Sequence, residues 1–202
     1  MITDKQFIIH RPVRYEVKIK RSLFIGSLAP VKDRDTAEAH IQAIRNEYSE
    51  ASHNCFAYRI DHHIFRYYDD GEPSYTAGKP ILTMIDKYNL LQCSVVVTRY
   101  FGGTKLGVGG LISAYSKCAE ETIAKADKIE LIDYQYYELT YPYKLTRQIE
   151  YIVAQYKGDI SESDYQVDVT SRLRIPTAAR DTFEKEINDT GSGQIDIKPL
   201  EG

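Results

Sequence analysis

Residues 93–118 read CSVVVTRYFGGTKLGVGGLISAYSKC. The near-continuous apolar run from Cys93 to Thr98 predicts a strand that is buried on both faces. A glycine-rich segment follows. Apolar residues then recur at helical spacing from Leu111 to Ala126, which predicts a long helix. A buried strand that leads into a helix through a short loop is typical of an α/β domain.

The glycine-rich segment 99–110 has the residue types of a phosphate-binding loop. Glycines let a ligand approach bare backbone, and free N–H groups at a helix start favour an anion. The spacing matches neither a Walker A loop nor the dinucleotide-binding fingerprint. The glycines would equally let the strand and the helix pack tightly, and the sequence leaves both interpretations open. In the first interpretation the phosphate or nucleic-acid contacts are Arg99, Gly102, Gly103, Lys105, Gly107, Gly109 and Gly110, together with Lys79.

A second segment, Tyr68-Asp-Asp-Gly-Glu-Pro73, carries three carboxylates within four residues. Oxygen ligands at this density suit Mg²⁺. They also suit a turn in which Asp side chains accept hydrogen bonds from backbone N–H groups and cap the next helix. We favour the structural interpretation. Lys79, at the start of that helix, either contacts phosphate or is only solvated.

The remaining patterns before residue 134 alternate between strand and helix. Apolar and charged residues alternate from Val13 to Lys20. Asp35 and Glu38 make a start that resembles a capping box, and Pro80 fits the first turn of another helix. The predicted elements are strands over 13–19, 23–25, 55–60 and 93–98 and helices over 35–48, 77–89 and 111–126.

The rest of the chain reads strand, helix, strand, strand, helix, strand, with a strictly alternating strand over 165–175. This order fits a ferredoxin-like plait. The charge changes at the same place: 18 Lys and Arg face 17 Asp and Glu through Asp133, whereas 8 face 12 after it. We therefore predict an α+β protein with two domains, 1–133 and 134–202.

The composition excludes several classes of protein. No apolar run approaches the roughly 18 residues of a membrane span, and the N-terminus lacks the layout of a secretion signal. Three cysteines without a CxxC pair argue against a disulfide scaffold or a structural zinc site. We expect a cytoplasmic protein. Since the net charge is −3, any affinity for RNA must come from a local patch.

His53 and Cys55 lie two residues apart on a predicted strand, which puts them on one face. A cysteine nucleophile needs a base aimed at its thiolate and a group that orients the base. The spacing permits such a contact without demonstrating it, so we assign no catalytic residue. Tyr134, Tyr136 and Tyr137 would stack on bases if a sheet face exposed them, although packing is their more ordinary role.

Together these segments resemble the IMPACT family in its two-domain bacterial, YigZ-like form. The resemblance implies that Asp69, Asp70, Gly71, Glu72 and Pro73 form the family's motif loop. The matching stretches, which span most of the first 120 residues, are Lys20-Arg-Ser-Leu-Phe-Ile25, Ser52-His-Asn-Cys55, Tyr68-Asp-Asp-Gly-Glu-Pro73, Thr76-Ala-Gly-Lys-Pro80, Val95-Val-Val-Thr-Arg-Tyr-Phe-Gly-Gly103, Lys105-Leu-Gly-Val-Gly-Gly-Leu111 and Ala114-Tyr115.

The resemblance also implies a fold and a biological setting. The N-terminal part would be a two-layer α/β domain like the second domain of a small-subunit ribosomal protein. The C-terminal part would be a ferredoxin-like domain similar to the fifth domain of elongation factor G. Eukaryotic relatives act by protein binding in translational control during amino-acid starvation, which is a stress response.

Our leading hypothesis is a non-enzymatic regulator of translation that binds RNA or a ribosome-associated partner. Its phosphate-facing surface would contain Arg99 and Lys105, with Lys79, Lys20 and Arg21. The first alternative is a metal-dependent enzyme acting on a phosphorylated substrate, in which the three carboxylates of the motif loop hold the metal. The second is a pure protein-interaction module with an exposed apolar patch. In the leading hypothesis we expect no cofactor, no resident metal and no membrane contact.

Overall fold

In the computed structural model, which describes residues 5–200, the apolar run after Cys93 forms strand β6 (Cys93–Tyr100). This strand is the middle of a five-stranded antiparallel sheet, and its residues from Cys93 to Arg99 are all buried. The sequence predicted a strand buried on both faces, and this prediction is confirmed. The spatial order is β2 (Val13–Ile19), β3 (Ser22–Pro30), β6, β4 (His53–Arg59) and β5 (Phe65–Tyr68).

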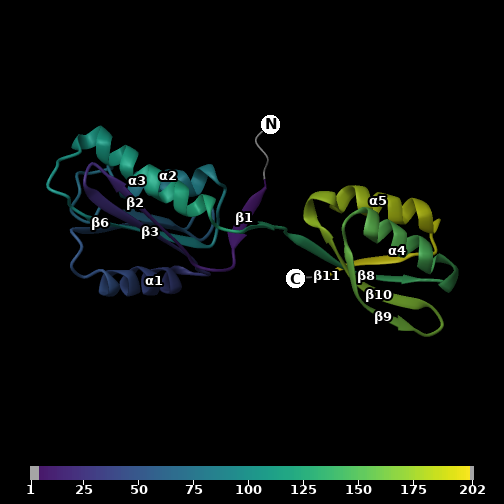
Figure 1. Cartoon of the computed structure of the whole chain (residues 1–202). Coiled ribbons are helices and arrows are strands. Elements are labelled where there is room, and N and C mark those ends of the chain that lie inside the picture. Colours follow the sequence, from purple (N-terminus) through teal and green to yellow (C-terminus); the bar gives the residue numbers. More distant parts are fainter. Residues whose placement is uncertain (1–4, 201–202) are drawn as a thin grey trace. The chain divides into compact units, whose positions relative to one another are not determined.

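Helices cover both faces of this sheet (Figure 1). Helix α1 (Arg34–Glu47) packs on one face, and α2 (Gly78–Lys87) and α3 (Gly107–Ala124) pack on the other. Alternate residues of β6 point to opposite cores, with Val96 toward α1 and Val95 toward α2 and α3. The α/β class is confirmed. The expected two layers are corrected to three, because apolar side chains on both faces of β4 and β6 require cover on both sides.

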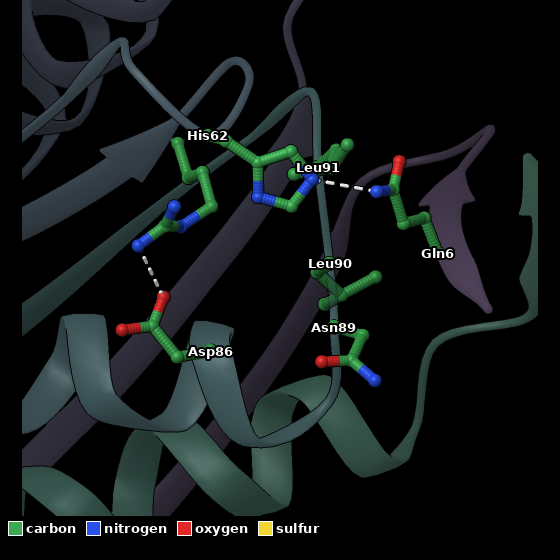
Figure 2. Close-up of a pocket in the computed structure, with 7 residues that line it drawn as sticks. Gln6, His62, Asp86, Asn89, Leu90 and Leu91 are labelled. Atoms are coloured by element: carbon green, nitrogen blue, oxygen red, sulfur yellow. Dashed lines mark hydrogen bonds and ion pairs between the residues drawn. The ribbon is translucent and has the colours of Figure 1, made fainter. Parts of the chain in front are cut away.

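Three strands of four residues, β5 and two others, escape the sequence patterns. Strand β1 (Gln6–Ile9) pairs with β7 (Lys128–Leu131) in a separate antiparallel ribbon. The ribbon is tied to the loop after α2, since the N–H of Phe7 donates to the carbonyl of Asn89 at 2.9 Å. Beside it lies a cavity of about 160 Å³, across which the Gln6 side chain contacts His62 at 2.6 Å (Figure 2). Four-residue strands are too short to produce a clear alternation.

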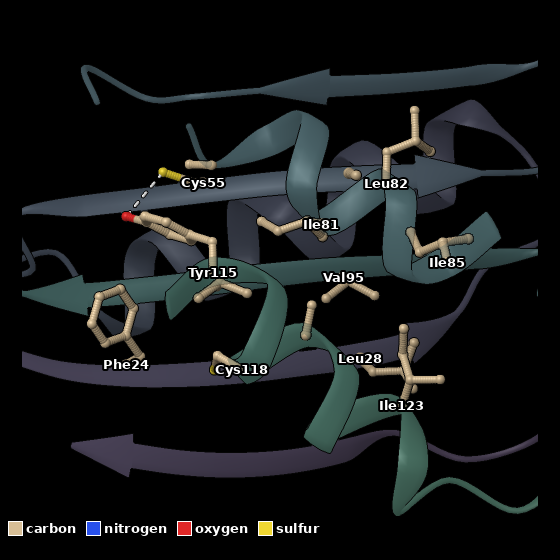
Figure 3. Close-up of a cluster of buried hydrophobic side chains, with 14 of the residues drawn as sticks. Phe24, Leu28, Cys55, Ile81, Leu82, Ile85, Val95, Tyr115, Cys118 and Ile123 are labelled. Carbon is tan, nitrogen blue, oxygen red and sulfur yellow. Dashed lines mark hydrogen bonds between the residues drawn. The ribbon is translucent and has the colours of Figure 1, made fainter. Parts of the chain in front are cut away.

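The larger core lies between the sheet and the pair α2 and α3 (Figure 3). Ile81 of α2 and Tyr115 of α3 lie toward the end of the sheet that holds Cys55, whereas Ile85 and Ile123 lie toward the other end. The two helices therefore run in the same general direction. Their N-termini lie at the end of the sheet where β6 finishes.

Helix α1 begins one residue earlier than the sequence predicted, and with a different cap. Asp33 accepts a hydrogen bond from the N–H of Thr36 at 2.8 Å, and the Thr36 hydroxyl reaches back to the N–H of Asp33 at 3.2 Å. This reciprocal pair is a capping box. The expected pair, Asp35 and Glu38, lies inside the helix instead. A helix that starts after Asp33 and one that starts at Asp35 both have an acidic residue before the apolar stripe. The sequence alone therefore does not distinguish the two starts.

The chain divides between Leu131 and Ile132 into two units, and the second unit is built on a four-stranded antiparallel sheet. The sheet order is β11-β8-β10-β9, which with the chain order of strands and helices confirms the predicted ferredoxin-like plait. Both helices lie on one face of the sheet (Figure 1). The elements are β8 (Tyr134–Tyr141), a short 3₁₀ turn (Tyr143–Leu145), α4 (Thr146–Gln155), β9 (Asp159–Tyr165), β10 (Val169–Pro176), a second 3₁₀ turn (Thr177–Ala179), α5 (Arg180–Gly191) and β11 (Asp196–Leu200).

The strand predicted over 165–175 is interrupted at its start. Tyr165 ends β9, and β10 begins at Val169, so the residues between them form a hairpin turn. Val167 is 91% exposed at this turn. The alternation of apolar and polar residues continues through the turn, which explains why the sequence pattern did not reveal it. Among residues 5–200 no helix is both long and apolar enough to cross a membrane.

Close packing of α3 on β3 gives the first testable prediction. A Cβ on Gly26 would lie 2.0 Å from the Thr122 hydroxyl oxygen. Gly26→Ala should therefore lower the free energy of unfolding by about 1–3 kcal/mol through overpacking, as measured by urea titration. Gly109→Ala is the matched control, because a Cβ there meets open space. Equal stability of the two variants would contradict this packing.

Candidate functional site

The two segments that the sequence singled out meet at the end of the sheet where β6 finishes. Arg99 of β6 is paired with Phe24 of β3 on one side and with His53 of β4 on the other. The acidic loop that follows β5 lies against the same end, since the N–H of Asn54 donates to an Asp70 carboxylate oxygen at 2.6 Å. The glycine loop leads from β6 into α3 at this end. The structure thus brings the motif loop and the glycine loop together.

A buried ion pair joins the two loops. Arg99 Nη1 contacts Glu72 Oε1, and both side chains are only 5% exposed. The Tyr115 hydroxyl of α3 donates to the same carboxylate oxygen at 2.9 Å. The guanidinium also lies 5.5 Å from the ring centroid of Phe24 and 5.4 Å from that of Phe101. Arg99, predicted as a phosphate contact, is therefore engaged inside the protein.

The other two carboxylates of the loop have different structural partners. Asp69 accepts hydrogen bonds from the N–H groups of Tyr75, Ala77 and Gly78 at 2.8–2.9 Å, and so caps the start of α2. Asp70 accepts from Asn54 and pairs with Arg45 at 3.2 Å. The three carboxylates thus turn to three different sets of donors. Within residues 5–200 no group of three His, Cys, Asp or Glu side chains is placed to hold a metal.

The glycines of the second loop fall into two classes. Gly102 and Gly110 are closely packed. A Cβ on Gly102 would lie 2.0 Å from the Arg21 carbonyl, which excludes a side chain, and one on Gly110 would lie 3.0 Å from Leu106, which is a tight contact. At Gly103, Gly107 and Gly109 a Cβ would have no heavy atom within 4 Å. Gly103 and Gly107 have φ angles of +80° and +74°, which favour glycine. Gly109 has neither a close neighbour nor a positive φ angle, so neither packing nor backbone conformation explains a glycine at this position.

A cavity of about 390 Å³ opens between the two loops and the start of α3. Most of its wall is apolar, and one acidic and three basic side chains border it. Lys105 is exposed, and Phe101 and Val108 are 49% and 59% exposed. The lining residues are His53, Glu72, Pro73, Arg99, Phe101, Lys105, Leu106, Gly107, Val108 and Leu111. Sequence analysis missed the apolar part of this lining, although Phe101 stands next to the glycine pair.

Four exposed cations lie at this end of the first unit: Lys20, Arg21, Lys79 and Lys105. We call this group the basic end. Within residues 5–200 none of the four has a carboxylate within 4.0 Å. Lys20 and Arg21 form the turn between β2 and β3 with φ angles of 43° and 69°. Positive φ is costly for such residues, so this turn carries local strain.

The geometry does not favour a cysteine nucleophile. The Cys55 thiol donates to the carbonyl of Asp69 at 2.9 Å and lies 3.4 Å from the Tyr115 hydroxyl (Figure 3). Burial raises the pKa of Cys55, which keeps the thiol protonated. His53 turns to the carbonyl of Asp70 instead, with Nδ1 at 2.7 Å. The His53 ring therefore does not face the Cys55 thiol, so this pair lacks the base that a cysteine nucleophile requires.

The sequence singled out two arginines and three tyrosines of the second unit, on strands β10 and β8. Arg172 and Arg174, two residues apart, share a face of β10, but Arg172 lies near Glu138 and Glu162 and Arg174 lies near Asp159. The three tyrosines of β8 also differ from one another. Tyr137 is fully buried, the Arg174 guanidinium lies 4.6 Å from the Tyr134 ring centroid, and Tyr136 is 39% exposed.

The fold and the site together define a two-domain class of protein. Its first domain is an α/β domain with a glycine loop beside a basic end, and its second is a ferredoxin-like domain. Residues 20–123 match the Impact N-terminal domain, and residues 139–194 match a domain of unknown function (DUF1949). The chain belongs to the IMPACT family, as the sequence resemblance predicted.

Full-length relatives support this assignment. The chain is 34% identical over 194 residues to the IMPACT family member YvyE of Bacillus subtilis, covering 95% of this chain and 89% of that protein. It is 32% identical over 194 residues to the IMPACT family member YigZ of Escherichia coli, with 94% and 95% covered. A crystal structure described as that of a hypothetical protein matches 99% of both chains, with a TM-score of 0.63 and 31% identity.

The buried ion pair gives the second prediction. Glu72→Gln removes the charge that compensates Arg99, and a buried unpaired charge costs about 3–5 kcal/mol of unfolding free energy. Urea titration measures this loss. Glu47→Gln is the control, because it breaks an ion pair with Arg14 whose side chains are 49% and 43% exposed, and such pairs contribute about 1 kcal/mol or less. Similar small losses in both variants would contradict a structural role for Glu72.

The three thiols give the third prediction. Burial raises the pKa of Cys55, Cys93 and Cys118, so all three should react slowly with Ellman's reagent at pH 8 in the native protein. All three should react at once in guanidinium chloride. A native thiol that reacts rapidly at neutral pH would revive the nucleophile hypothesis.

Proposed function

We propose that this protein is a non-enzymatic regulator of translation that binds RNA through its basic end. The observation that carries the proposal is that four exposed cations without carboxylate partners in the described chain lie together at one end of the first unit, namely Lys20, Arg21, Lys79 and Lys105. Such cations are the usual contacts for a phosphate backbone. The translational setting follows from what the family resemblance implies.

Two helix N-termini add to the positive potential of the basic end. The first turns of α2 and α3 contain no acidic residue. The first N–H groups of a helix carry a partial positive charge and favour anions. At α2 the Asp69 carboxylate already occupies two of these groups, whereas at α3 no side chain caps the helix. The start of α3 is therefore the better placed of the two for a phosphate.

The contact is assigned to the first unit for electrostatic reasons. Asp and Glu outnumber Lys and Arg by 12 to 8 after residue 133. The two arginines on the open face of β10, Arg172 and Arg174, lie near carboxylates that reduce their attraction for phosphate. A net negative unit repels an RNA backbone unless free cations gather on one face.

The enzyme alternative loses support from the loop geometry. It required the motif loop and the glycine loop to converge, and they do, since Glu72 contacts Arg99. However, it also required Asp69, Asp70 and Glu72 to turn toward one ion. Each of these carboxylates instead accepts hydrogen bonds from protein donors in a different direction.

One observation favours the protein-interaction alternative. Phe101, Val108 and Ile112 are 49%, 59% and 40% exposed, and the first two border the cavity beside the basic end. An apolar cluster rimmed by cations suits an acidic protein partner with an apolar anchor. The two functions differ in their response to salt, because phosphate contacts release counterions and apolar contacts do not.

The fourth prediction distinguishes the RNA-binding function from the protein-interaction function. The measurement is the affinity for purified ribosomes and for single-stranded RNA over a range of salt concentrations. Lys20→Gln/Lys105→Gln should weaken binding and flatten the salt dependence, with the slope falling by about 0.7 for each phosphate that is no longer neutralised. Lys32→Gln/Lys125→Gln is the control, because both lysines are exposed and lie toward the opposite end of the first unit.

Three outcomes would count against the proposal. Absence of binding to RNA and to ribosomes at low salt would refute it. Equal weakening by both double variants would show that the overall charge matters rather than the basic end. Ribosome binding that ignores both salt and the lysines would favour the apolar protein contact around Phe101 and Val108.

A further inference from the structure

The cavity beside the Glu72–Arg99 pair has the dimensions of a small-molecule site. Its volume is about 390 Å³. Cavities that bind small organic ligands usually measure about 300–1,000 Å³ and combine apolar walls with a few fixed polar groups. A stacked double helix cannot enter such a space, because its bases are held inside the duplex. A single unpaired base can be turned out of its strand and enter.

Phe101 provides a platform for such a base. The residue is 49% exposed and borders the cavity, while the buried Arg99 guanidinium lies 5.4 Å from the ring centroid. The ring is therefore supported by a fixed group and still accessible. Leu106, Val108 and Leu111 complete the apolar wall. Stacking on an exposed aromatic ring is tolerant of base identity, which suits a general RNA-binding surface.

His53 adds a hydrogen-bond acceptor to the cavity. Its Nδ1 lies 2.7 Å from the carbonyl oxygen of Asp70. Because a carbonyl oxygen only accepts, Nδ1 carries a proton, and in the neutral tautomer with this proton Nε2 has a free lone pair. Within residues 5–200 Nε2 has no hydrogen-bond partner, and it lies 3.8 Å from Glu72 Oε1. A donor on a bound nucleotide fits this nitrogen.

The backbone next to the cavity is bare where a phosphate would approach. Gly107 lines the cavity, and Cβ atoms on Gly107 and Gly109 would have no heavy atom within 4 Å. Lys105 is exposed on the same lining. Glycine in a helix costs up to about 1 kcal/mol relative to alanine, yet Gly109 has no packing contact that explains its presence.

We propose that this cavity holds one unstacked nucleotide of a single-stranded RNA. The base stacks on Phe101, a donor of the nucleotide bonds to His53 Nε2, and its phosphate lies at Lys105 and the first turn of α3. This inference rests on the proposed RNA-binding function and adds that the protein distinguishes unpaired from paired RNA.

The fifth prediction is tested by fluorescence anisotropy with a labelled 12-nucleotide single strand and the corresponding RNA duplex. Phe101→Ala should weaken single-strand binding about tenfold and leave duplex binding unchanged. Phe65→Ala is the matched control, since Phe65 is 47% exposed and its strand partner is Arg59, at the opposite end of β4 from His53. This control should change neither affinity.

Two further variants test the polar contacts. His53→Asn keeps a donor for the Asp70 carbonyl but removes Nε2, so single-strand affinity should fall while the thermal unfolding midpoint changes little. Gly109→Ala should leave that midpoint unchanged or raise it, because the added methyl meets open space, while single-strand affinity falls. A weaker affinity in a protein that is no less stable cannot be ascribed to misfolding.

The results separate this inference from the proposed function. If Phe101→Ala leaves single-strand binding unchanged, or weakens single-strand and duplex binding equally, the nucleotide cavity is refuted. If the Lys20→Gln/Lys105→Gln variant still weakens binding in that case, the basic end remains the RNA contact. If the wild-type protein binds neither RNA at low salt, both proposals are refuted.

Discussion

The buried contact between Glu72 and Arg99 holds together three segments that lie far apart in the sequence. Glu72 belongs to the motif loop, Arg99 to the end of β6, and Tyr115, which donates to the same carboxylate, to α3. Burying two charges costs several kcal/mol for each ion, and only close pairing with additional hydrogen bonds offsets that cost. The arrangement therefore favours a single relative position of the motif loop and the glycine loop, and the cavity between them has a fixed wall.

The same ion pair separates two kinds of cation that look alike in the sequence. Arg99 is 5% exposed and serves as a fixed internal group between the rings of Phe24 and Phe101. Lys105, six residues later, is exposed and has no carboxylate partner in the described chain. A planar guanidinium suits the first role because it can bond and stack at once, whereas a flexible ammonium suits a mobile phosphate contact. In the proposed site, Arg99 therefore has an indirect role, through the ring of Phe101 and the placement of the loops.

Much of the fold could be predicted because its strongest signals are local. The apolar run of β6 and the strand and helix order of the second unit each follow from short-range patterns, and both agree with the structure. The role of Arg99 could not be predicted in this way, because its partner Glu72 lies 27 residues earlier and only the fold brings them together. The third layer was implied by a strand buried on both faces. The wall formed by Phe101 and Val108 gave no signal, since isolated apolar residues near a turn are common.

The glycines of the loop differ in the structural reason for glycine at each position. Gly102 and Gly110 support tight packing, since added Cβ atoms would lie 2.0 Å and 3.0 Å from their neighbours. Gly103 and Gly107 support the unusual backbone, with φ angles of +80° and +74°. Gly109 meets neither condition, and alanine would suit the helix better there. The fold therefore gives neither a packing reason nor a backbone reason for glycine at position 109. This is the observation from which the proposed ligand contact at the first turn of α3 is argued.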